Sequence, residues 1–374
     1  MFVMTEKDIK EETENQHERY GIIIPTDLLQ QYTERWFNRL TFTRCIEKFM
    51  DTSRPLKNVT FCSTLSNYIR QLNTETISCI IQTANSDFIN KMFVMIEADL
   101  DDTSKDRYEY FGIVIPDNLL QQYIERWFEC LTTTMDLEKY INKNRLMKNI
   151  TFCTALRIHM KQLNIEKICS LIQTAKGDFI NKMFVITEDD VDDKSEIIYE
   201  RIKDNTDNRY EYFGCVIPDS LLQKYIERWL NCVEKSDSAM EYMNCTRPLN
   251  NVTFRNELRT FLRQLNTEKI WTLIGTKGRD FLNTMFVMNE EDINDNAKHQ
   301  YECFGIVIPF DLLNLYIERW LDRTIYKYET DKFSVKEAMA VNRPMRNVAF
   351  RSALCSYIKR LSAKKSFTAE ELIS

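Results

Sequence analysis

The feature that most constrains this fold is a short apolar sequence, Met-Phe-Val, that recurs along the chain. It begins at residues 1, 92, 183 and 285, at intervals of 91, 91 and 102 residues. Each copy is followed by an acidic stretch, a Gly-x-x-x-Pro sequence and a Glu-Arg-Trp sequence. Recurrence at a near-constant spacing is typical of tandem repeats. The sequence therefore predicts repeat 1 (residues 1–91), repeat 2 (92–182), repeat 3 (183–284) and repeat 4 (285–374).

Two of the four repeats depart from the common pattern. Repeat 3 has an insertion near residues 197–208, inside its acidic stretch, which predicts that this stretch lies at the surface. Repeat 4 ends in residues 362–374, which are too few for a full third helix and are predicted to form an atypical C-terminal cap. No linker separates the repeats, so we expect neighbouring repeats to pack against each other.

Repeat 2 illustrates the predicted elements. Residues 92–96 favour a short strand, and the acidic residues 97–105 favour a loop. Residues 110–115 form a continuous apolar run, which predicts a strand buried on both faces and paired with the first strand as a hairpin. Pro116 suits the first position of a long helix. Two further helices follow, the last of which is predicted over residues 74–90 in repeat 1. The predicted fold class is therefore α+β and helix-rich, with a two-stranded element and about three helices per repeat.

One face of the predicted long helix is apolar. In repeat 2 it carries Leu119, Leu120, Tyr123 and Trp127 at helical spacing. A tryptophan in this register is predicted to lie in the core, and the alternative is a binding platform for a base or a peptide. The same positions hold Leu28, Leu29, Tyr32 and Trp36, then Leu221, Leu222, Tyr225 and Trp229, then Leu312, Leu313, Tyr316 and Trp320.

Composition excludes several classes of protein. The chain is 44% hydrophobic, which is enough to build cores, yet no apolar run reaches the length of a membrane span. Residues 1–10 lack the basic and apolar regions of a secretory signal. The 11 cysteines are odd in number and form no Cys-x-x-Cys pair, which indicates free thiols in a reducing compartment. We therefore expect an intracellular protein, in the cytoplasm or nucleus.

Basic residues recur at a turn that begins with arginine and on the helix that follows it. In repeat 3 Arg255, Arg259 and Arg263 form one helical stripe. These charged and recurrent positions are predicted to face solvent. They are candidate contacts for a protein partner, or for nucleic-acid phosphates along a basic track. The net charge of −6 argues against a general nucleic-acid coat. The candidate set is Arg54, Lys57, Arg70, Arg145, Lys148, Lys161, Arg247, Arg255, Arg259, Arg263, Arg343, Arg346 and Lys359.

Other recurrent features have structural interpretations. Arg126 is predicted to lie on an exposed helix face and to bridge to a neighbouring repeat. The acidic stretches at 97–102, 188–193 and 290–295 lack the glycine and the ligand spacing of a calcium loop, and are predicted to be solvated loops that serve as contacts for a basic partner. Asn58 lies in an Asn-x-Thr glycosylation sequon, but without a signal peptide it is predicted to cap a helix. Gly112, isolated in a predicted strand, indicates a bulge or a close backbone approach.

The sequence contains no catalytic, cofactor-binding or metal-binding signature. Its three histidines, His17, His159 and His299, occupy different kinds of position, and it has no Gly-rich phosphate loop or nucleophile turn. We therefore expect a protein that is not an enzyme and that uses no cofactor or metal.

The predicted function is multivalent protein binding by a tandem-repeat scaffold, because repetition multiplies weak contacts with an extended partner. Two alternatives are nucleic-acid binding along the basic track and a secreted effector or toxin. The duplication resembles that of duplicated reading frames in large DNA viruses, which implies a virus-encoded protein that contacts host proteins. The partner's identity and the oligomeric state are open at this point.

Overall fold

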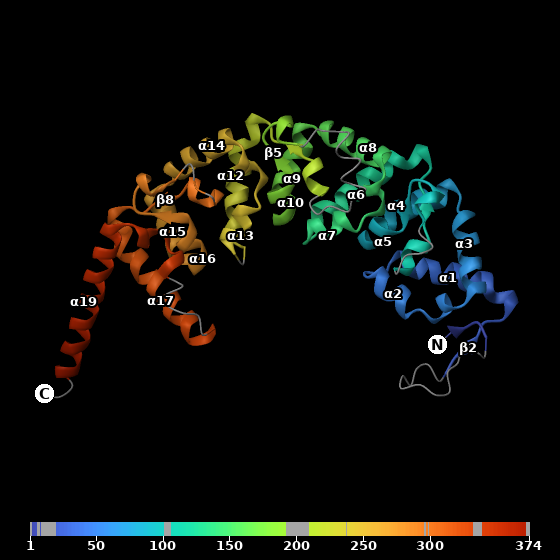
Figure 1. Cartoon of the computed structure of the whole chain (residues 1–374), viewed down its shortest axis with the longest axis horizontal. Coiled ribbons are helices and arrows are strands. Elements are labelled where there is room, and N and C mark those ends of the chain that lie inside the picture. The colour runs from blue at the N-terminus through green and yellow to red at the C-terminus, as the bar shows by residue number, and fades with distance from the viewer. Residues whose placement is uncertain are drawn as a thin grey trace. The chain divides into compact units, whose positions relative to one another are not determined.

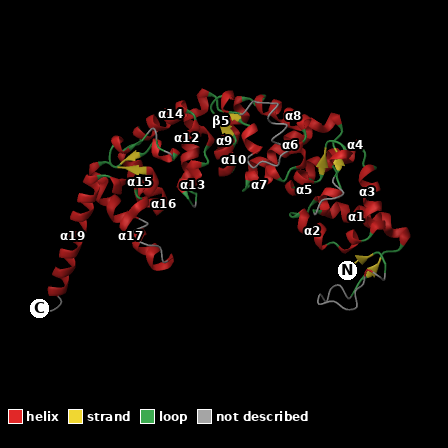
Figure 2. Cartoon of the chain, viewed as in Figure 1, coloured by secondary structure: helices red, strands yellow, loops and turns green. Residues whose placement is uncertain are grey.

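The computed structural model describes residues 2–5, 8, 20–100, 106–191, 209–236, 238–294, 297, 299–331 and 339–371. It divides into a first lobe, residues 1–164 and 191–214, and a second lobe, residues 165–190 and 215–374. Helices predominate, and the strands form small two-stranded sheets (Figure 1; Figure 2). The predicted helix-rich α+β class is confirmed, whereas the four-repeat division stays a prediction. The predicted insertion at 197–208 lies outside the described residues.

The first lobe begins with strands β1 and β2 and continues to helix α8, with one further turn near its end. Its elements are β1 (Phe2–Val3), β2 (Ile22–Ile23), η3 (Thr26–Leu28), α1 (Leu29–Thr41), α2 (Ile46–Thr52), η4 (Arg54–Lys57), α3 (Val59–Arg70), α4 (Thr74–Thr83), α5 (Ser86–Lys91), β3 (Phe93–Val94), η5 (Glu97–Asp99), η6 (Arg107–Tyr110), β4 (Ile113–Val114), η7 (Asp117–Leu119), α6 (Leu120–Thr133), α7 (Leu137–Asn142), η8 (Arg145–Lys148), α8 (Ile150–Lys161) and η10 (Arg209–Tyr212).

The second lobe begins with helix α9 and ends with helix α19. Its elements are α9 (Ile165–Thr174), α10 (Gly177–Lys182), β5 (Phe184–Val185), η9 (Glu188–Asp190), β6 (Cys215–Val216), α12 (Asp219–Val233), α13 (Ala239–Asn244), η11 (Arg247–Asn250), α14 (Val252–Arg263), α15 (Thr267–Thr276), α16 (Arg279–Met285), β7 (Phe286–Val287), η12 (Glu290–Asp292), η13 (Gln300–Cys303), β8 (Ile306–Val307), η14 (Phe310–Leu312), α17 (Leu313–Asp331), η15 (Arg343–Arg346) and α19 (Val348–Glu371).

The two-stranded sheets are parallel, which shows that the predicted hairpin was wrong. In the first lobe Phe93 pairs with Ile113, and in the second lobe Phe286 pairs with Ile306. A hairpin joins antiparallel strands through a tight turn, whereas parallel strands need a crossover connection of a dozen or more residues. Residues 95–112, which separate β3 from β4, are long enough to make that crossover.

The predicted second strand is also too long. Only Ile113 and Val114 (β4) pair as a strand, while Tyr110 belongs to the 3-10 helix η6 and Phe111 is extended but lies outside the sheet. Ile113 is buried, but Val114 is 37% exposed, so the strand is not buried on both faces as predicted. Tyr108 and Phe111 reach the core without belonging to the paired strand, which explains why apolar character alone overestimated the strand.

The long helices α1, α6, α12 and α17 carry the aromatic core. Pro116 lies just before the short turn η7, so α6 starts one turn later than predicted. The tryptophans of these long helices lie in the core, as predicted, and the fully buried ones pack edge-on against phenylalanine rings, such as Phe152 against Trp127 at 5.8 Å between ring centroids. The exposed fractions are 6% for Trp36, 0% for Trp127 and Trp229, and 1% for Trp320.

Asparagine caps set the boundaries of several helices. Asn58 Oδ1 accepts the backbone N–H of Thr60 at 2.9 Å, which confirms the predicted cap of α3. The helix predicted over residues 74–90 is two helices, α4 and α5, because the backbone is extended at Ala84 and Asn85 and Asn85 caps α5. The last helix, α19, runs to Glu371, so residues 362–371 of the predicted C-terminal cap continue this helix.

Candidate interaction surfaces

A buried hydrogen-bond network joins the long helix α6 to the helix that precedes it. Asn90 of α5 is 2% exposed, and its Oδ1 accepts the indole N–H of Trp127 at 2.9 Å and the Nδ2 of Asn144 at 2.9 Å. Its own Nδ2 donates to the carbonyl of Tyr140 at 2.8 Å. The hydroxyl of Tyr123 donates to the carbonyl of Ile89 at 2.7 Å. We call this contact, between a helix pair and the long helix that follows it, a junction.

The second lobe contains two more junctions of the same construction. At one of them Trp320 donates to Asn283 Oδ1 at 2.8 Å, and Asn342 donates to the same oxygen at 2.9 Å. At the other, Trp229 donates to the hydroxyl of Thr246 at 3.1 Å, and Thr246 is hydrogen-bonded to Asn181. The three asparagines belong to α5, α10 and α16, so the helix pairs α4–α5, α9–α10 and α15–α16 each pack on the long helix that follows.

Arginines on the long helices cap the first helix of these pairs. Arg228 of α12 donates to the carbonyls of Ile172 at 3.2 Å and Ala175 at 3.0 Å, at the C-terminal end of α9. Arg323 of α17 donates in the same way to the carbonyls of Ile274 and Gly275 near the end of α15. A cation at a helix C-terminus satisfies open carbonyls and complements the helix dipole.

Arg126 of α6 makes the corresponding contact in the first lobe, to the carbonyl of Ala84 at 3.4 Å. The predicted bridge from the Glu-Arg-Trp arginine to the preceding helix pair is therefore present for Arg126 and Arg228. The equivalent Arg319 instead lies near Asp322 at 4.0 Å. In that long helix Arg323, one turn further along, takes over the capping contact.

The arginine that starts each basic turn points into the protein. The prediction of exposed contact residues is wrong for Arg145 and Arg343, whose exposed fractions are 9% and 3%. Arg145 donates to the carbonyls of Phe111 at 2.6 Å, Glu109 at 3.0 Å and Asp99 at 3.1 Å. Those carbonyls lie in the crossover between β3 and β4, so the guanidinium holds that crossover together.

The same clamp recurs with three other arginines. Arg343 donates to the carbonyls of Thr284 at 2.7 Å and Phe304 at 2.8 Å, and burial lowers its pKa to about 10. A buried charge is tolerated only when its hydrogen-bonding groups are satisfied, and the carbonyls supply that here. Arg54 and Arg247 also donate to crossover carbonyls, those of Asp8 at 2.8 Å and Asp190 at 3.3 Å.

Little space remains beside the glycine where this clamp passes the strand. A Cβ atom added to Gly112 would lie 2.8 Å from Leu100, 3.2 Å from Val94 and 3.3 Å from the Nη1 of Arg145. At Gly305 it would lie 3.0 Å from Val287 and 3.4 Å from the Nη1 of Arg343. The predicted close approach is therefore present, and the groups that come nearest are the side chains of Leu100 and Val287, with the buried guanidinium beside them.

Two of the other basic candidates are paired with the predicted acidic stretches, and a third is paired with Glu302 of η13. Arg70 Nε lies 3.4 Å from Glu97, and Arg263 Nε donates to Glu290 at 2.7 Å. Arg346 lies 2.8 Å from Glu302. The side chains of the basic residues are more than half exposed, so these ion pairs contribute little stability. The two surfaces predicted to meet a partner are therefore partly satisfied by each other.

The predicted arginine stripe of repeat 3 makes contacts within the second lobe. Arg255 donates to the carbonyls of Leu249 at 2.7 Å and Asn250 at 3.1 Å. Arg259 donates to the carbonyl of Cys303 at 2.7 Å. The remaining basic candidates, Lys57, Lys148, Lys161 and Lys359, are exposed on their turns or helices.

One aspartate in each acidic stretch has a structural role. Asp190 Oδ2 accepts the backbone N–H of Thr187 at 2.8 Å, and both carboxylate oxygens accept Asn251 Nδ2 at 3.0–3.1 Å. Asp292 makes the same pair of contacts with its own turn and with Asn347. Asn251 and Asn347 therefore each connect an acidic turn to the helix that they cap.

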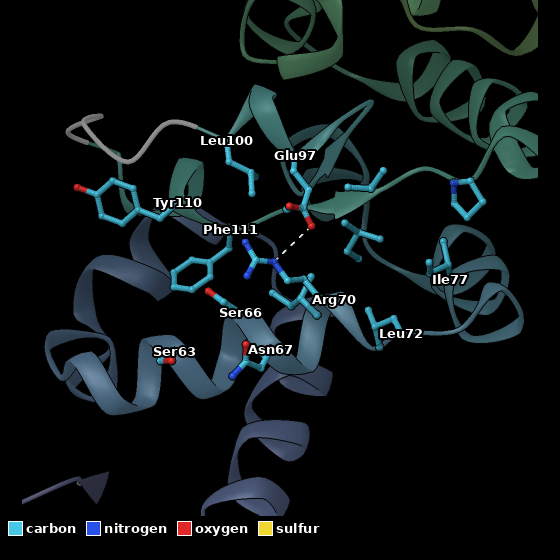
Figure 3. A pocket seen from close by; sticks show the side chains of 15 residues that line it. Ser63, Ser66, Asn67, Arg70, Leu72, Ile77, Glu97, Leu100, Tyr110 and Phe111 are labelled. Atoms are coloured by element: carbon cyan, nitrogen blue, oxygen red, sulfur yellow. Dashed lines mark ion pairs between the residues drawn. The ribbon is translucent and has the colours of Figure 1, made fainter.

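A groove in the first lobe lies on a predicted contact surface. Its volume is about 590 Å³, and Figure 3 shows it between α3 and the segment from η5 to β4. Ser63, Ser66, Asn67 and Arg70 line one side, and the Arg70–Glu97 ion pair spans it. Apolar residues lie among these polar groups, namely Ile69, Leu72, Ile77, Leu100, Phe111 and Ile113.

The corresponding place in the second lobe holds an arginine. Arg259 occupies on α14 the position that Ser66 occupies on α3, four residues before Arg263 and Arg70 respectively. Its contact with the Cys303 carbonyl crosses from α14 to η13, at the level where Tyr110 borders the first-lobe groove. A small side chain at position 66 is therefore what leaves room in the groove.

A buried ion network adds charge to the first-lobe junction. Lys91 of α5, whose side chain is 5% exposed, lies 2.9 Å from Asp87 and 3.1 Å from Glu47 of α2. Glu47 also accepts Lys143 Nζ at 2.7 Å. Burial raises the pKa of Glu47, but the hydrogen bonds from Lys143 and Lys91 outweigh burial and lower this pKa below its ordinary value. Burial likewise opposes the charge of Lys91, yet Asp87 and Glu47 raise its pKa.

Sequence reasoning missed the junction asparagines. The signal was the Phe-Ile-Asn or Phe-Leu-Asn sequence just before each internal Met-Phe-Val, which places Asn90, Asn181 and Asn283 at matching positions. A polar residue at the end of an apolar helix face is predicted to be exposed unless its hydrogen-bond partner is known. The partner is a tryptophan 37 residues later at Asn90 and Asn283, and the periodicity of one helix does not reveal such a separation.

Among the residues that the structure describes, no helix is both long and apolar enough to cross a membrane. Within the same residues no group of three or more His, Cys, Asp or Glu side chains is arranged to hold a metal ion. All 11 cysteines are free thiols.

No protein-family model, curated protein or solved structure matches this chain. The local geometry of its junctions, clamps and groove is therefore the basis for a functional proposal.

Proposed function

We propose that the protein is a scaffold of four tandem repeats that binds protein partners, and that the groove between α3 and β4 receives an extended polypeptide segment. The observation that carries the proposal is the groove itself, a hollow of about 590 Å³ on the surface of the first lobe. Its lining mixes hydroxyl, amide and charged groups with apolar side chains, which is the mixture that recognises a peptide backbone and selects its side chains.

The chemistry of the groove defines the kind of segment that fits. Arg70 and Glu97 are an exposed pair worth at most about 1 kcal/mol, so a partner that offers its own carboxylate or amine exchanges one ion pair for another at little cost. Ile69, Leu72 and Ile77 provide apolar contact for alternate side chains. The preferred segment therefore carries at least one charged residue flanked by apolar residues.

Repetition supports a scaffold in which several weak contacts combine. The starts at residues 1, 92, 183 and 285 place the same element series in succession, and a partner that contacts two repeats binds the second at high effective concentration. The basic set supports a nucleic-acid track less well, because Arg145 and Arg343 are buried and Arg70, Arg263 and Arg346 are paired with glutamates.

A peptide selection on the full chain tests this proposal. Peptides are selected from a random display library and measured by titration against the wild type, against Ser66→Arg and against Thr60→Arg. Ser66→Arg fills the groove with the residue found at the matching place in the second lobe, whereas Thr60 is an exposed residue of α3 outside the groove. We expect Ser66→Arg to weaken binding at least about tenfold, or 1.4 kcal/mol, and Thr60→Arg to leave it unchanged.

Two results would contradict the proposal. One is a set of selected peptides whose affinity is the same for Ser66→Arg as for the wild type. The other is preferential retention on single-stranded RNA or duplex DNA with a steep loss of affinity in salt, which is the behaviour of phosphate binding.

A further inference from the structure

The apolar surface beside α1, formed by β1, β2 and η3 together with Tyr32, is exposed where the equivalent surface beside α6 is covered, and we call it the face of α1. Phe2 is 41% exposed, whereas its counterpart Phe93 is fully buried. Leu28 is 45% exposed, whereas its counterpart Leu119 is 8% exposed. Ile22 is 50% exposed, against 1% for Ile113. The positions correspond through the matching strand registers and the Gly-x-x-x-Pro sequences.

The helix pair α4–α5 covers this face of α6. Both helices pack on α6, and α5 also packs on β3. Phe88 of α5 meets Phe93 edge-on, with ring centroids 6.1 Å apart, and Tyr123 of α6 donates to the carbonyl of Ile89. In the second lobe α9–α10 and α15–α16 cover α12 and α17 in the same manner, through Tyr225 and Tyr316. The same kind of helix pair thus fills the same kind of face at each junction.

The face of α1 retains the features that a helix pair would use. It forms a mostly apolar hollow of about 520 Å³ that includes Phe2, Ile22, Tyr32 and Leu28. Tyr32 holds the place of Tyr123, whose hydroxyl donates to a helix carbonyl at the junction. The area exposed here is therefore the counterpart of an established interface within this same chain.

Two arginines line the same hollow and define the polarity of its occupant. Arg35 is the counterpart of Arg126 and Arg228, and Arg39 is the counterpart of Arg323. Those three arginines donate to the C-terminal carbonyls of the covering helix. The α1 face therefore has both capping positions filled with arginine, where each internal junction uses one of them.

One difference narrows the chemistry of the occupant further. The indole N–H of Trp36 donates to Ser53 Oγ at 3.0 Å, within the first lobe, where Trp127 needs Asn90 from the covering helix. Phe49 stands where Tyr140 uses its hydroxyl to bind the Ser86 carbonyl of α5. An occupant of the face of α1 therefore has to supply apolar side chains and the open carbonyls at a helix C-terminus, but it does not have to supply a side-chain amide.

We propose that the face of α1 is a docking site for a pair of short helices supplied by a partner protein. The first helix ends with its C-terminal carbonyls on Arg35 and Arg39, and the second presents an aromatic side chain to Phe2. This surface is separate from the groove lined by Ser66, so the inference does not depend on the proposed function.

The test uses the full chain with a copy of residues 73–91 placed directly before Met1. This reproduces the join between Lys91 and Met92 and supplies a helix pair of known fit. Hydrogen exchange of α1 and binding of an apolar dye are compared with those of the unmodified chain. We expect amide exchange in α1 to slow at least about tenfold and dye fluorescence to fall.

Two matched variants separate docking from simple attachment. In the copied segment alone, the change corresponding to Asn90→Ala should keep the protection, because Trp36 already has its partner. The change corresponding to Phe88→Asp should abolish it, and so should Arg35→Glu combined with Arg39→Glu in the chain.

Three results would overturn the inference. The first is no change in α1 exchange or dye binding on adding the wild-type copy, and the second is equal protection from the copy with Phe88→Asp. The third is a dimer of the unmodified chain, found by sedimentation and dissociated by Arg35→Glu, because a second copy would then be the occupant. Ser66→Arg should affect none of these readouts, so the failure of this inference and that of the proposed function are distinguishable.

Discussion

Trp127 and Asn90 are joined by a 2.9 Å hydrogen bond in a region from which water is excluded. Asn90 belongs to the helix before the Met-Phe-Val sequence, and Trp127 belongs to the long helix after it. The junction between what the sequence divides into repeat 1 and repeat 2 is therefore the interior of one packed unit. The boundary between the lobes also keeps a helix pair with the long helix that follows it, because it falls after Asn164, just before α9.

Replacing Asn90 with alanine should destabilise the first lobe by about 2–3 kcal/mol. The indole N–H of Trp127 would be left buried without an acceptor, and such a group costs about 1–3 kcal/mol. Thermal and urea unfolding of the full chain measure the effect. Asn67→Ala is the matched control, because Asn67 is exposed on α3 and should change stability by less than about 0.5 kcal/mol. Equal stability of the Asn90 variant and the control would contradict the buried network.

Replacing the clamp arginine Arg343 with lysine should destabilise the second lobe by about 3 kcal/mol. A lysine ammonium cannot reproduce the planar set of donors that reaches the carbonyls of Thr284, Phe304 and Tyr301. Breaking a buried charge arrangement in this way is strongly destabilising. Arg346→Lys, on the same turn but 57% exposed, is the control for unfolding measurements. If the two substitutions have equal effects, Arg343 is not a structural clamp.

The ion network around Glu47 should make stability depend on pH below 4.5. The pKa of Glu47 is lowered on folding from its ordinary value of 4.5, so its charged form stabilises the fold above that pH. That contribution is lost as pH falls through the folded pKa. The difference in Tm between the wild type and Glu47→Gln should therefore be constant near neutrality and shrink from pH 4.5 downward.

Glu75→Gln, which alters an exposed carboxylate of α4, is the control for this pH series. Lys91 gives the opposite sign, because its raised pKa stabilises the fold below 10.5 and the effect is lost as pH rises through the folded value. A Glu47→Gln difference that stays the same from pH 7 to pH 3 would show that the network does not contribute as described.

Removing the capping arginine Arg228 should have a smaller effect, about 0.5–1.5 kcal/mol. Its two hydrogen bonds to the end of α9 are partly exposed, and helix-end interactions of this kind are of that size. Arg319→Ala is the control, because Arg319 lies on the matching turn of α17 and contacts Asp322 instead. Hydrogen exchange should show faster opening of α9 in Arg228→Ala alone, and unchanged exchange there would argue against capping.

The parts of the fold that depend on local patterns could be predicted from the sequence. The apolar face with Trp127 and the cap at Asn58 follow from spacing within one helix or one turn. The direction of the strand pair could not be predicted, because two-residue strands carry no signal for parallel or antiparallel pairing. The crossover that decides it depends on Arg145, whose partners lie 34–46 residues earlier.

The candidate contact residues show the same limit. A recurrent arginine is predicted to be exposed because it is charged. Arg145 and Arg343 are instead buried, and they recur because they donate hydrogen bonds to backbone carbonyls. The groove exists because the small side chain of Ser66 faces β4, which belongs to the next predicted repeat. The sequence of α3 alone does not indicate that β4 lies beside it. Recurrence identifies residues that matter to the fold or to function, but it does not distinguish a buried structural arginine from an exposed contact residue.

The most direct test of this account is to express two segments of the same length. Residues 73–163 keep α4 and α5 with the long helix that they cover, whereas residues 92–182 follow the sequence repeat and remove Asn90 from Trp127. Far-UV circular dichroism with urea titration should show that 73–163 is helical and unfolds cooperatively, and that 92–182 does not. Cooperative folding of 92–182 together with an unfolded 73–163 would contradict the central claim, that each helix pair belongs to the long helix that follows it.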